Sequence, residues 1–169
     1  MSRTATRKIN GSPPLHFEHD NAICYSGYRE GQSPLVRTYP SYDEVREDLL
    51  ILAKNWKYLR LYDCSPHAST VLGVIRNEGL DFKVMLGLDM AAEMSNPHCP
   101  WGAEFSDESL ALNRRRNGMQ VDMLIALAKR YSDTVLSVSD GNEASVEWTD
   151  HMEPVKNLVA YVKKIKRQI

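Results

Sequence analysis

Short apolar runs alternate with amphipathic stretches along the chain from residue 22 onward. The runs at 22–25, 59–62, 82–88 and 134–139 have the length and composition of buried strands. After each run, apolar residues recur at helical spacing, in stretches that begin near residues 41, 69, 107 and 154. Because two parallel strands need a crossover connection, this fourfold strand–helix order predicts a parallel sheet.

Polar residues mark where the predicted helices start and end. Ser41 and Glu44 have the spacing of a capping box, in which each residue satisfies a backbone N–H of the other. Gly79 suits the position after the second helix, predicted over 69–78, and the third is predicted over 107–131. Pro154 is expected at the first helical position of the last helix.

The predicted fold class is α/β, with four consecutive βα units whose parallel strands resemble the first half of a (β/α)8 TIM barrel. Four units also suit a small open sheet, and periodicity does not separate these two architectures. A complete barrel needs about 250 residues, with roughly 200 as a floor, whereas this chain has 169. We expect a leader over 1–21, because it has no apolar period, and one folded domain over 22–169.

Composition narrows the classes of function. Lys and Arg (21) nearly balance Asp and Glu (22), which argues against a nucleic-acid partner because no basic excess is present to displace counterions. No apolar run approaches the ~20 residues of a membrane span, and no apolar core of a signal peptide is visible, so the localisation stays open. The three widely spaced cysteines do not form a disulfide framework.

The residues just after each predicted strand carry the candidate chemistry, because ligands meet parallel sheets at the carboxyl ends of the strands. No phosphate-binding glycine loop and no nucleophile elbow occurs there, so no cofactor is predicted. Aromatic, carboxylate and amide side chains at one rim are typical of a site for a polyhydroxylated ligand. These residues are Tyr25, Tyr62, Asp63, Asp89, Asn142 and Glu143.

A zinc site is the alternative interpretation of a second group of residues. Cys64, His67, His98 and Cys99 offer four nitrogen and sulfur ligands. The side chains of adjacent residues diverge, which disfavours one tetrahedral site that uses both His98 and Cys99. No metal is therefore predicted.

Three strand ends, in order, resemble those of glycoside hydrolase family 17, the β-1,3-glucanases and related glucan-active (β/α)8 enzymes. The matching segments are Ile23-Cys24-Tyr25, Leu59-Arg60-Leu61-Tyr62-Asp63 and Gly141-Asn142-Glu143. The run 143–151 is similar to the bacterial and fungal members in particular. The resemblance spans about residues 22–165 and covers only the N-terminal half of that family's barrel.

This resemblance implies a retaining hydrolysis of β-1,3-glucan, with a β-glucan polysaccharide or oligosaccharide as the partner. Glu143 would be the proton donor and later the base, and Asn142 would bind the sugar 2-hydroxyl. Tyr25 and Tyr62 would line the cleft, and Asp63 is a further candidate for sugar binding at the rim.

Two departures from the family leave alternatives open. The family's nucleophile is a Glu at the end of the seventh strand, whereas four strands are predicted here, so none of these residues is assigned as the nucleophile. A missing C-terminal half or a homodimer would close the barrel, and a glucan transglycosylase or a non-catalytic glucan-binding half-barrel are the other functions. Asp140 stands where the family has an apolar residue, and it either disturbs the surroundings of Glu143 or points to solvent.

Overall fold

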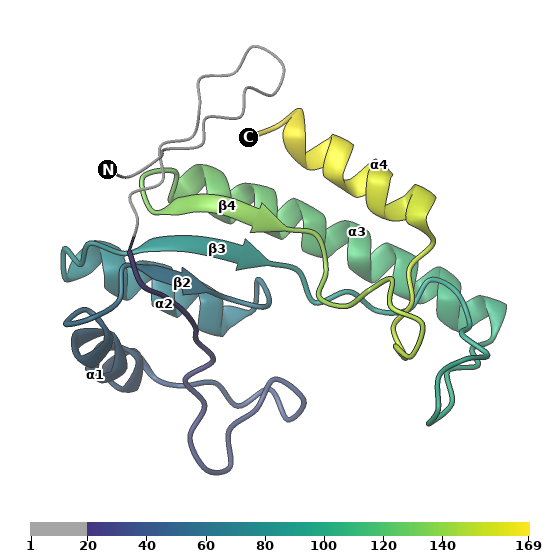
Figure 1. The fold of residues 1–169 in the computed structure, drawn as a ribbon, viewed down its shortest axis with the longest axis horizontal. Coiled ribbons are helices and arrows are strands. Elements are labelled where there is room, and N and C mark those ends of the chain that lie inside the picture. Colours follow the sequence, from purple (N-terminus) through teal and green to yellow (C-terminus); the bar gives the residue numbers. More distant parts are fainter. Residues whose placement is uncertain (1–19) are drawn as a thin grey trace, which may run out of the picture.

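A computed structural model describes residues 20–169 and confirms the predicted alternation of strands and helices (Figure 1). The predicted leader over 1–21 lies almost entirely outside the described residues. Strands and helices follow one another as β1 (Ala22–Cys24), α1 (Tyr42–Leu52), β2 (Tyr58–Arg60), α2 (Pro66–Asn77), β3 (Lys83–Gly87), α3 (Asp107–Arg130), β4 (Val135–Ser139) and α4 (Val155–Lys166).

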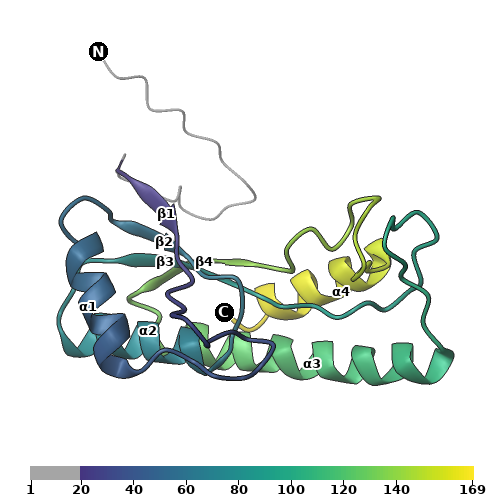
Figure 2. The same cartoon turned by 90° about the horizontal axis from the view of Figure 1, so that it is seen from below.

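The four strands form one parallel sheet in the order β1-β2-β3-β4. Doubly wound sheets reverse their strand order at a switch point, whereas a barrel keeps sequential strands side by side. Figure 2 shows α1, α2 and α3 together on one side of the sheet. The fold is therefore α/β with a singly wound sheet, the arrangement of a partial barrel.

The core lies between the sheet and these helices. Alternate strand residues such as Leu59, Val84 and Leu86 point into it, and α2 contributes Val71 and Leu72, all of them buried. Fully burying an aliphatic side chain of this kind contributes about 1.5–3 kcal/mol. The helix-covered face of the sheet therefore supplies most of the hydrophobic stabilisation.

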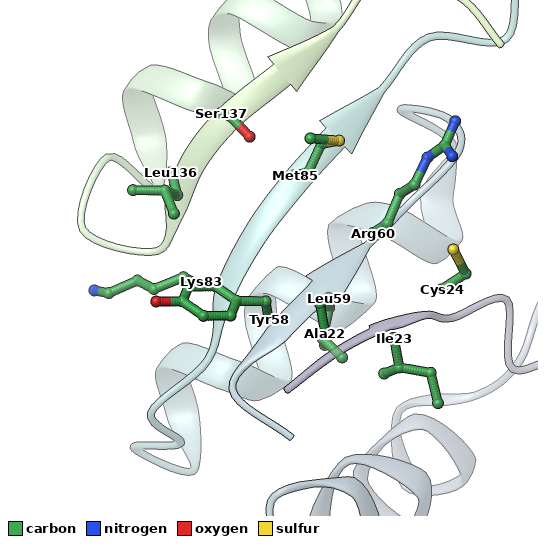
Figure 3. Close-up of a pocket in the computed structure, with 10 residues that line it drawn as sticks. All are labelled: Ala22, Ile23, Cys24, Tyr58, Leu59, Arg60, Lys83, Met85, Leu136 and Ser137. Carbon is green, nitrogen blue, oxygen red and sulfur yellow. The ribbon is translucent and has the colours of Figure 1, made fainter. Parts of the chain in front are cut away.

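The opposite face of the sheet is open among the described residues. Arg60, Met85 and Ser137 belong to the lining of a hollow of about 410 Å³ on this face (Figure 3). Met85 is 40% exposed although it lies in the middle of β3. In a closed barrel these side chains would fill the interior, so the open face is the surface that further strands would cover.

Two helix starts differ from the sequence predictions. The helix α2 begins at Pro66, earlier than residue 69, because proline suits the first helical turn. Pro154 is the N-cap of α4 instead of its first helical residue. The capping box is confirmed, since Ser41 Oγ accepts from Glu44 N at 3.3 Å and Glu44 Oε2 accepts from Ser41 N at 2.7 Å.

The helix α3 links the end of the sheet to α4. It spans 24 residues, packs on β3 and β4, and is joined to α4 by an ion pair between Asp122 and Lys164 at 2.6 Å. Within residues 20–169, no helix is both long and apolar enough to cross a membrane. The long α3 instead supports the loops that follow β3 and β4.

Candidate active site

The carboxyl ends of the strands open into a groove of about 830 Å³. Tyr62, Asp63, Asp89 and Asn142, four of the rim residues predicted from the sequence, belong to its lining. They follow the ends of β2, β3 and β4. Other side chains of this lining are Tyr39, Met90, Arg116, Gln120 and His151.

Arg60 joins the two sides of this groove. Its Nη2 donates to Asn142 Oδ1 at 2.7 Å, and its guanidinium lies over the Tyr62 ring, 4.7 Å from the centroid. Because Arg60 holds the amide oxygen, the Asn142 side chain is left with its N–H groups for a ligand. Arg60 was predicted only as part of a strand, and the signal for a further role is a charged residue within an otherwise apolar strand.

Glu143 occupies a tight turn directly after Asn142. Its φ of 54° lies in the left-handed region, and its side chain is exposed. Non-glycine residues in this conformation cost of order 1–3 kcal/mol and concentrate at functional sites. Gly141, with φ 79°, precedes the pair, and a Cβ there would approach the Ala144 Cβ to 3.0 Å. The turn therefore depends on glycine to project Glu143 outward.

Tyr62 lies within electrostatic reach of Glu143. A hydrogen bond to Cys24 raises the pKa of the Tyr62 phenol, and burial and the charge of Glu143 act in the same direction, while Arg60 opposes them. Tyr62 and Arg60 thus lie together beside Asn142, and Glu143 follows Asn142 in the same turn but does not belong to the lining of the groove. A phenol, an amide and a cation meet there, which suits hydrogen bonding to hydroxyl groups.

His151 supports the turn from the other end of the same loop. Its Nε2 lies 2.9 Å from the Asn142 carbonyl oxygen and its Nδ1 lies 2.7 Å from Asp150 Oδ1. Burial disfavours the imidazolium, but these two hydrogen bonds outweigh it and raise the pKa of His151. Protonated His151 donates to both oxygens and holds the Asn142 backbone in place.

Tyr25 does not belong to the lining of the groove. It is buried, its hydroxyl donates to Asp48 Oδ2 at 2.9 Å, and burial raises the pKa of the phenol strongly. Its ring lies against His67, whose two ring nitrogens are buried without a hydrogen-bond partner within residues 20–169. The structure thus places Tyr25 beneath the end of β1, apart from Asn142 and Tyr62.

The two aspartates at the rim are engaged in local interactions. Asp63 Oδ1 accepts from Ser65 N at 3.0 Å, next to the start of α2. Asp89 Oδ2 pairs with Arg116 Nη2 at 2.6 Å. Both carboxylates line the groove, but each already has a partner.

Asp140 is turned away from solvent. Both of its carboxyl oxygens are buried without a hydrogen-bond partner in the described part of the chain. Burial raises its pKa to about 6, and the charge of Glu93 adds to that shift. Of the two orientations that the sequence allows for Asp140, the structure has the one in which the carboxyl group points away from solvent.

Asp140 belongs to a buried polar cluster behind the loop that follows β4. Asn117 of α3 donates to Glu93 Oε1 at 3.0 Å and to Glu153 Oε1 at 2.7 Å. Glu93 also accepts from Tyr161 of α4 and from Arg114 of α3. Burial raises the pKa of Glu153 to about 8, helped by the charges of Glu93 and Asp140, so it carries a proton at neutral pH. This cluster fixes the loop against both helices, and no sequence motif predicts it.

Metal binding has no geometric support in the described region. Among residues 20–169, no three or more His, Cys, Asp or Glu side chains are grouped so as to hold a metal ion. Cys64 is buried, and its thiol donates to the Gly87 carbonyl at 3.2 Å. Burial raises the pKa of that thiol to about 12, which keeps it protonated.

Comparisons with known proteins agree with this fold. The crystal structure of an endo-laminarinase from Formosa Hel1_33_131 matches 86% of this chain with a TM-score of 0.64 and 26% sequence identity. The chain covers 37% of that enzyme's chain, so it spans little more than a third of its length. No protein-family model and no curated protein matches the sequence. The chain shares the fold of part of a glycosidase.

Proposed function

We propose that this chain forms the N-terminal half of a β-1,3-glucanase of glycoside hydrolase family 17. The observation that carries the proposal is the hydrogen bond from Arg60 to Asn142, which joins β2 to the turn that presents Glu143. The likeness to an endo-laminarinase and the ordered strand-end motifs support a glucan as the ligand. The groove at the strand ends is the proposed binding site.

The proposed reaction is a retaining double displacement. Glu143 donates its proton to the glycosidic oxygen as that bond to the anomeric carbon breaks and a carboxylate nucleophile attacks the same carbon. Glu143 then takes a proton from the water that displaces the enzyme carboxylate. The Asn142 amide N–H groups, left unengaged by Arg60, donate to the sugar 2-hydroxyl, a contact that strengthens as positive charge develops.

We infer that the nucleophile comes from outside these 169 residues. Asp63 and Asp89 at the rim each have a local partner, Ser65 N and the Arg116 guanidinium, and neither is assigned as the nucleophile. The strands β1 and β4 each pair with one neighbour within the described sheet. A C-terminal half, or a second copy of this chain, would pair with those edges and bring a carboxylate opposite Glu143.

The engaged aspartates also favour a second candidate, glucan binding without hydrolysis. In that case the purified chain binds β-1,3-glucan oligosaccharides but releases no reducing ends. A transglycosylase would use the same residues and pass the glycosyl group to another sugar, so mass spectrometry of the products would show lengthened chains.

The test is a Glu143→Gln substitution in the natural full-length protein, assayed on laminarin. Loss of general acid–base catalysis should lower kcat by about 10²–10⁴-fold. Glu147→Gln is the matched control, because Glu147 is an exposed carboxylate of the same loop. Retention of wild-type laminarin hydrolysis by Glu143→Gln would contradict the proposal.

A further inference from the structure

Two exposed tryptophans lie together near the candidate active site. Trp101 belongs to the loop that follows β3, and Trp148 to the loop that follows β4. They are 63% and 45% exposed, and their ring centroids are 6.3 Å apart with the planes inclined by 54°. Indole rings carry a large apolar area, and such exposure of two adjacent rings marks a surface for binding.

The two loops that carry these rings are tied to each other by buried polar groups. The Asn96 side-chain amide donates to the carbonyl oxygens of Glu147 and Thr149, both at 2.7 Å. The backbone N–H of Glu93 donates to the Met152 carbonyl at 3.1 Å. Asn96 and Thr149 are buried. The rings are therefore displayed on a fixed platform, so little conformational entropy is lost when a ligand binds.

A chain of hydrogen bonds connects this pair to the turn with Glu143. His151 and then the Trp101 side chain hydrogen-bond to the Asp150 carboxylate, and both lower the pKa of Asp150. His151 in turn contacts the Asn142 carbonyl oxygen at 2.9 Å. Trp148 is five residues beyond Glu143 in the same loop. Hydrogen bonds thus connect the tryptophan pair to the turn that carries Asn142 and Glu143.

Pyranose rings have the chemistry to bind on this platform. The axial C–H groups of a β-glucose unit form an apolar face with a slight positive charge, which complements the negative face of an indole.

We propose that Trp101 and Trp148 form a sugar-binding subsite for β-glucan units that extend beyond those bound at Asn142 and Glu143. This subsite rests on the proposed function, because it takes further units of the same glucan chain. It predicts that long oligosaccharides bind more tightly than short ones, and that the difference comes from the two indoles.

Titration of the purified chain with laminarihexaose and laminaribiose tests the proposal. A Trp56→Phe background leaves Trp101 and Trp148 as the fluorescent reporters, and calorimetry gives the affinities. Trp101→Ala and Trp148→Ala should each weaken hexaose binding by about five- to tenfold, as expected for one lost ring contact. Trp148→Phe should restore part of the loss. Tyr42→Ala is the control, since Tyr42 is an exposed aromatic of α1.

Each outcome bears on one of the two proposals. Unchanged hexaose affinity in both tryptophan variants, or absence of hexaose binding and of any fluorescence change in the Trp56→Phe background, overturns the subsite. An Asn142→Ala variant reports on the groove separately. If hexaose binding depends on the indoles but not on Asn142, the subsite stands and the proposed function of the groove is wrong. Circular dichroism spectra of all variants show whether they are folded.

Discussion

Gly87, at the carboxyl end of β3, determines how closely two strand ends approach each other. A Cβ at this position would lie 2.6 Å from the Leu61 carbonyl oxygen and 2.9 Å from the Tyr62 carbonyl oxygen. Both are backbone atoms, so the strain cannot be relieved by rotating a side chain. The absence of a side chain here lets Tyr62 and Asp63 emerge close to β3, where the groove begins.

We therefore expect Gly87→Ala to destabilise the fold and to displace Tyr62. Overpacking of this kind costs about 1–3 kcal/mol, which thermal unfolding should register as a clear fall in Tm. Gly73→Ala in α2 is the matched control, because its Cβ would meet nothing closer than the Tyr131 hydroxyl at 4.0 Å. The Gly73→Ala change should raise the free energy of unfolding by about 0.5–1 kcal/mol, because alanine has the higher helix propensity. An equal response of the two variants would contradict this account.

The side chain of Glu143 is exposed, and its backbone is in the left-handed conformation that glycine adopts more easily than glutamate. The turn holds because Gly141 precedes it and because His151 binds the Asn142 carbonyl oxygen. Strained backbone conformations persist where surrounding hydrogen bonds hold them, and they are concentrated at functional sites. The strain at Glu143 is consistent with its proposed role in catalysis.

At the level of elements, α3, α4 and the loop after β4 are held together by the buried carboxylates. Glu153 and Glu93 share the amide of Asn117, and Glu153 Oε2 is buried without a hydrogen-bond partner within residues 20–169. A second negative charge in this cluster would be costly because the interior solvates it poorly. The packing of α3, α4 and the loop after β4 is therefore more favourable when Glu153 is protonated.

The stability of the protein should fall as the pH rises from 5.5 to 8.5. The pKa of Glu153 is raised to about 8 in the folded protein, whereas an unfolded glutamate titrates near about 4.3. Between these values the folded state binds the extra proton, so stability is fully present below the unfolded pKa and is lost as the pH passes the folded one. Asp140, with its pKa raised to about 6, adds to the same slope.

Glu153→Gln isolates this contribution, because glutamine keeps the carbonyl acceptor for Asn117 and does not ionise. The drop in Tm between pH 5.5 and 8.5 should shrink by several degrees in this variant. Glu147→Gln, an exposed carboxylate of the same loop, should leave the drop unchanged. Identical slopes for wild type and Glu153→Gln would show that Glu153 is ionised throughout.

At the level of the whole molecule, the sheet is covered on one face and open on the other. Arg60, Met85 and Ser137 line the open hollow, and β1 and β4 each have one pairing partner in the described sheet. Unpaired strand edges present free N–H and C=O groups that pair readily with further strands. Closure of the barrel by additional strands would bury both the hollow and the edges.

Hydrogen exchange of the purified chain should reveal this asymmetry. Amides of β2 and β3, which are paired on both sides, should exchange slowly, while the outward amides of β1 and β4 exchange quickly. Addition of a polypeptide that completes the barrel should slow the edge amides selectively. Slow exchange at the outward amides of the chain alone would instead indicate that copies of this chain already cover those edges.

The order of the elements could be predicted from sequence patterns alone, and so could the edge of the sheet where candidate side chains gather. Apolar periodicity is a local property, so the alternation of strands and helices and the capping box at Ser41 were correctly predicted. The rule that ligands meet the strand ends was enough to select Tyr62, Asp63 and Asn142. The role of Glu143 as acid/base is still a prediction from family resemblance.

The architecture of the four units and the contacts between distant side chains could be read from the three-dimensional fold but not from the sequence. The strand order β1-β2-β3-β4 separates a partial barrel from a doubly wound sheet, and it depends on pairing between segments that periodicity does not relate. Tyr25 pairs with Asp48, while Arg60 reaches Asn142 across 82 positions of sequence. Contacts of this length depend on how helices and strands pack together, because local propensity carries no information about distant partners.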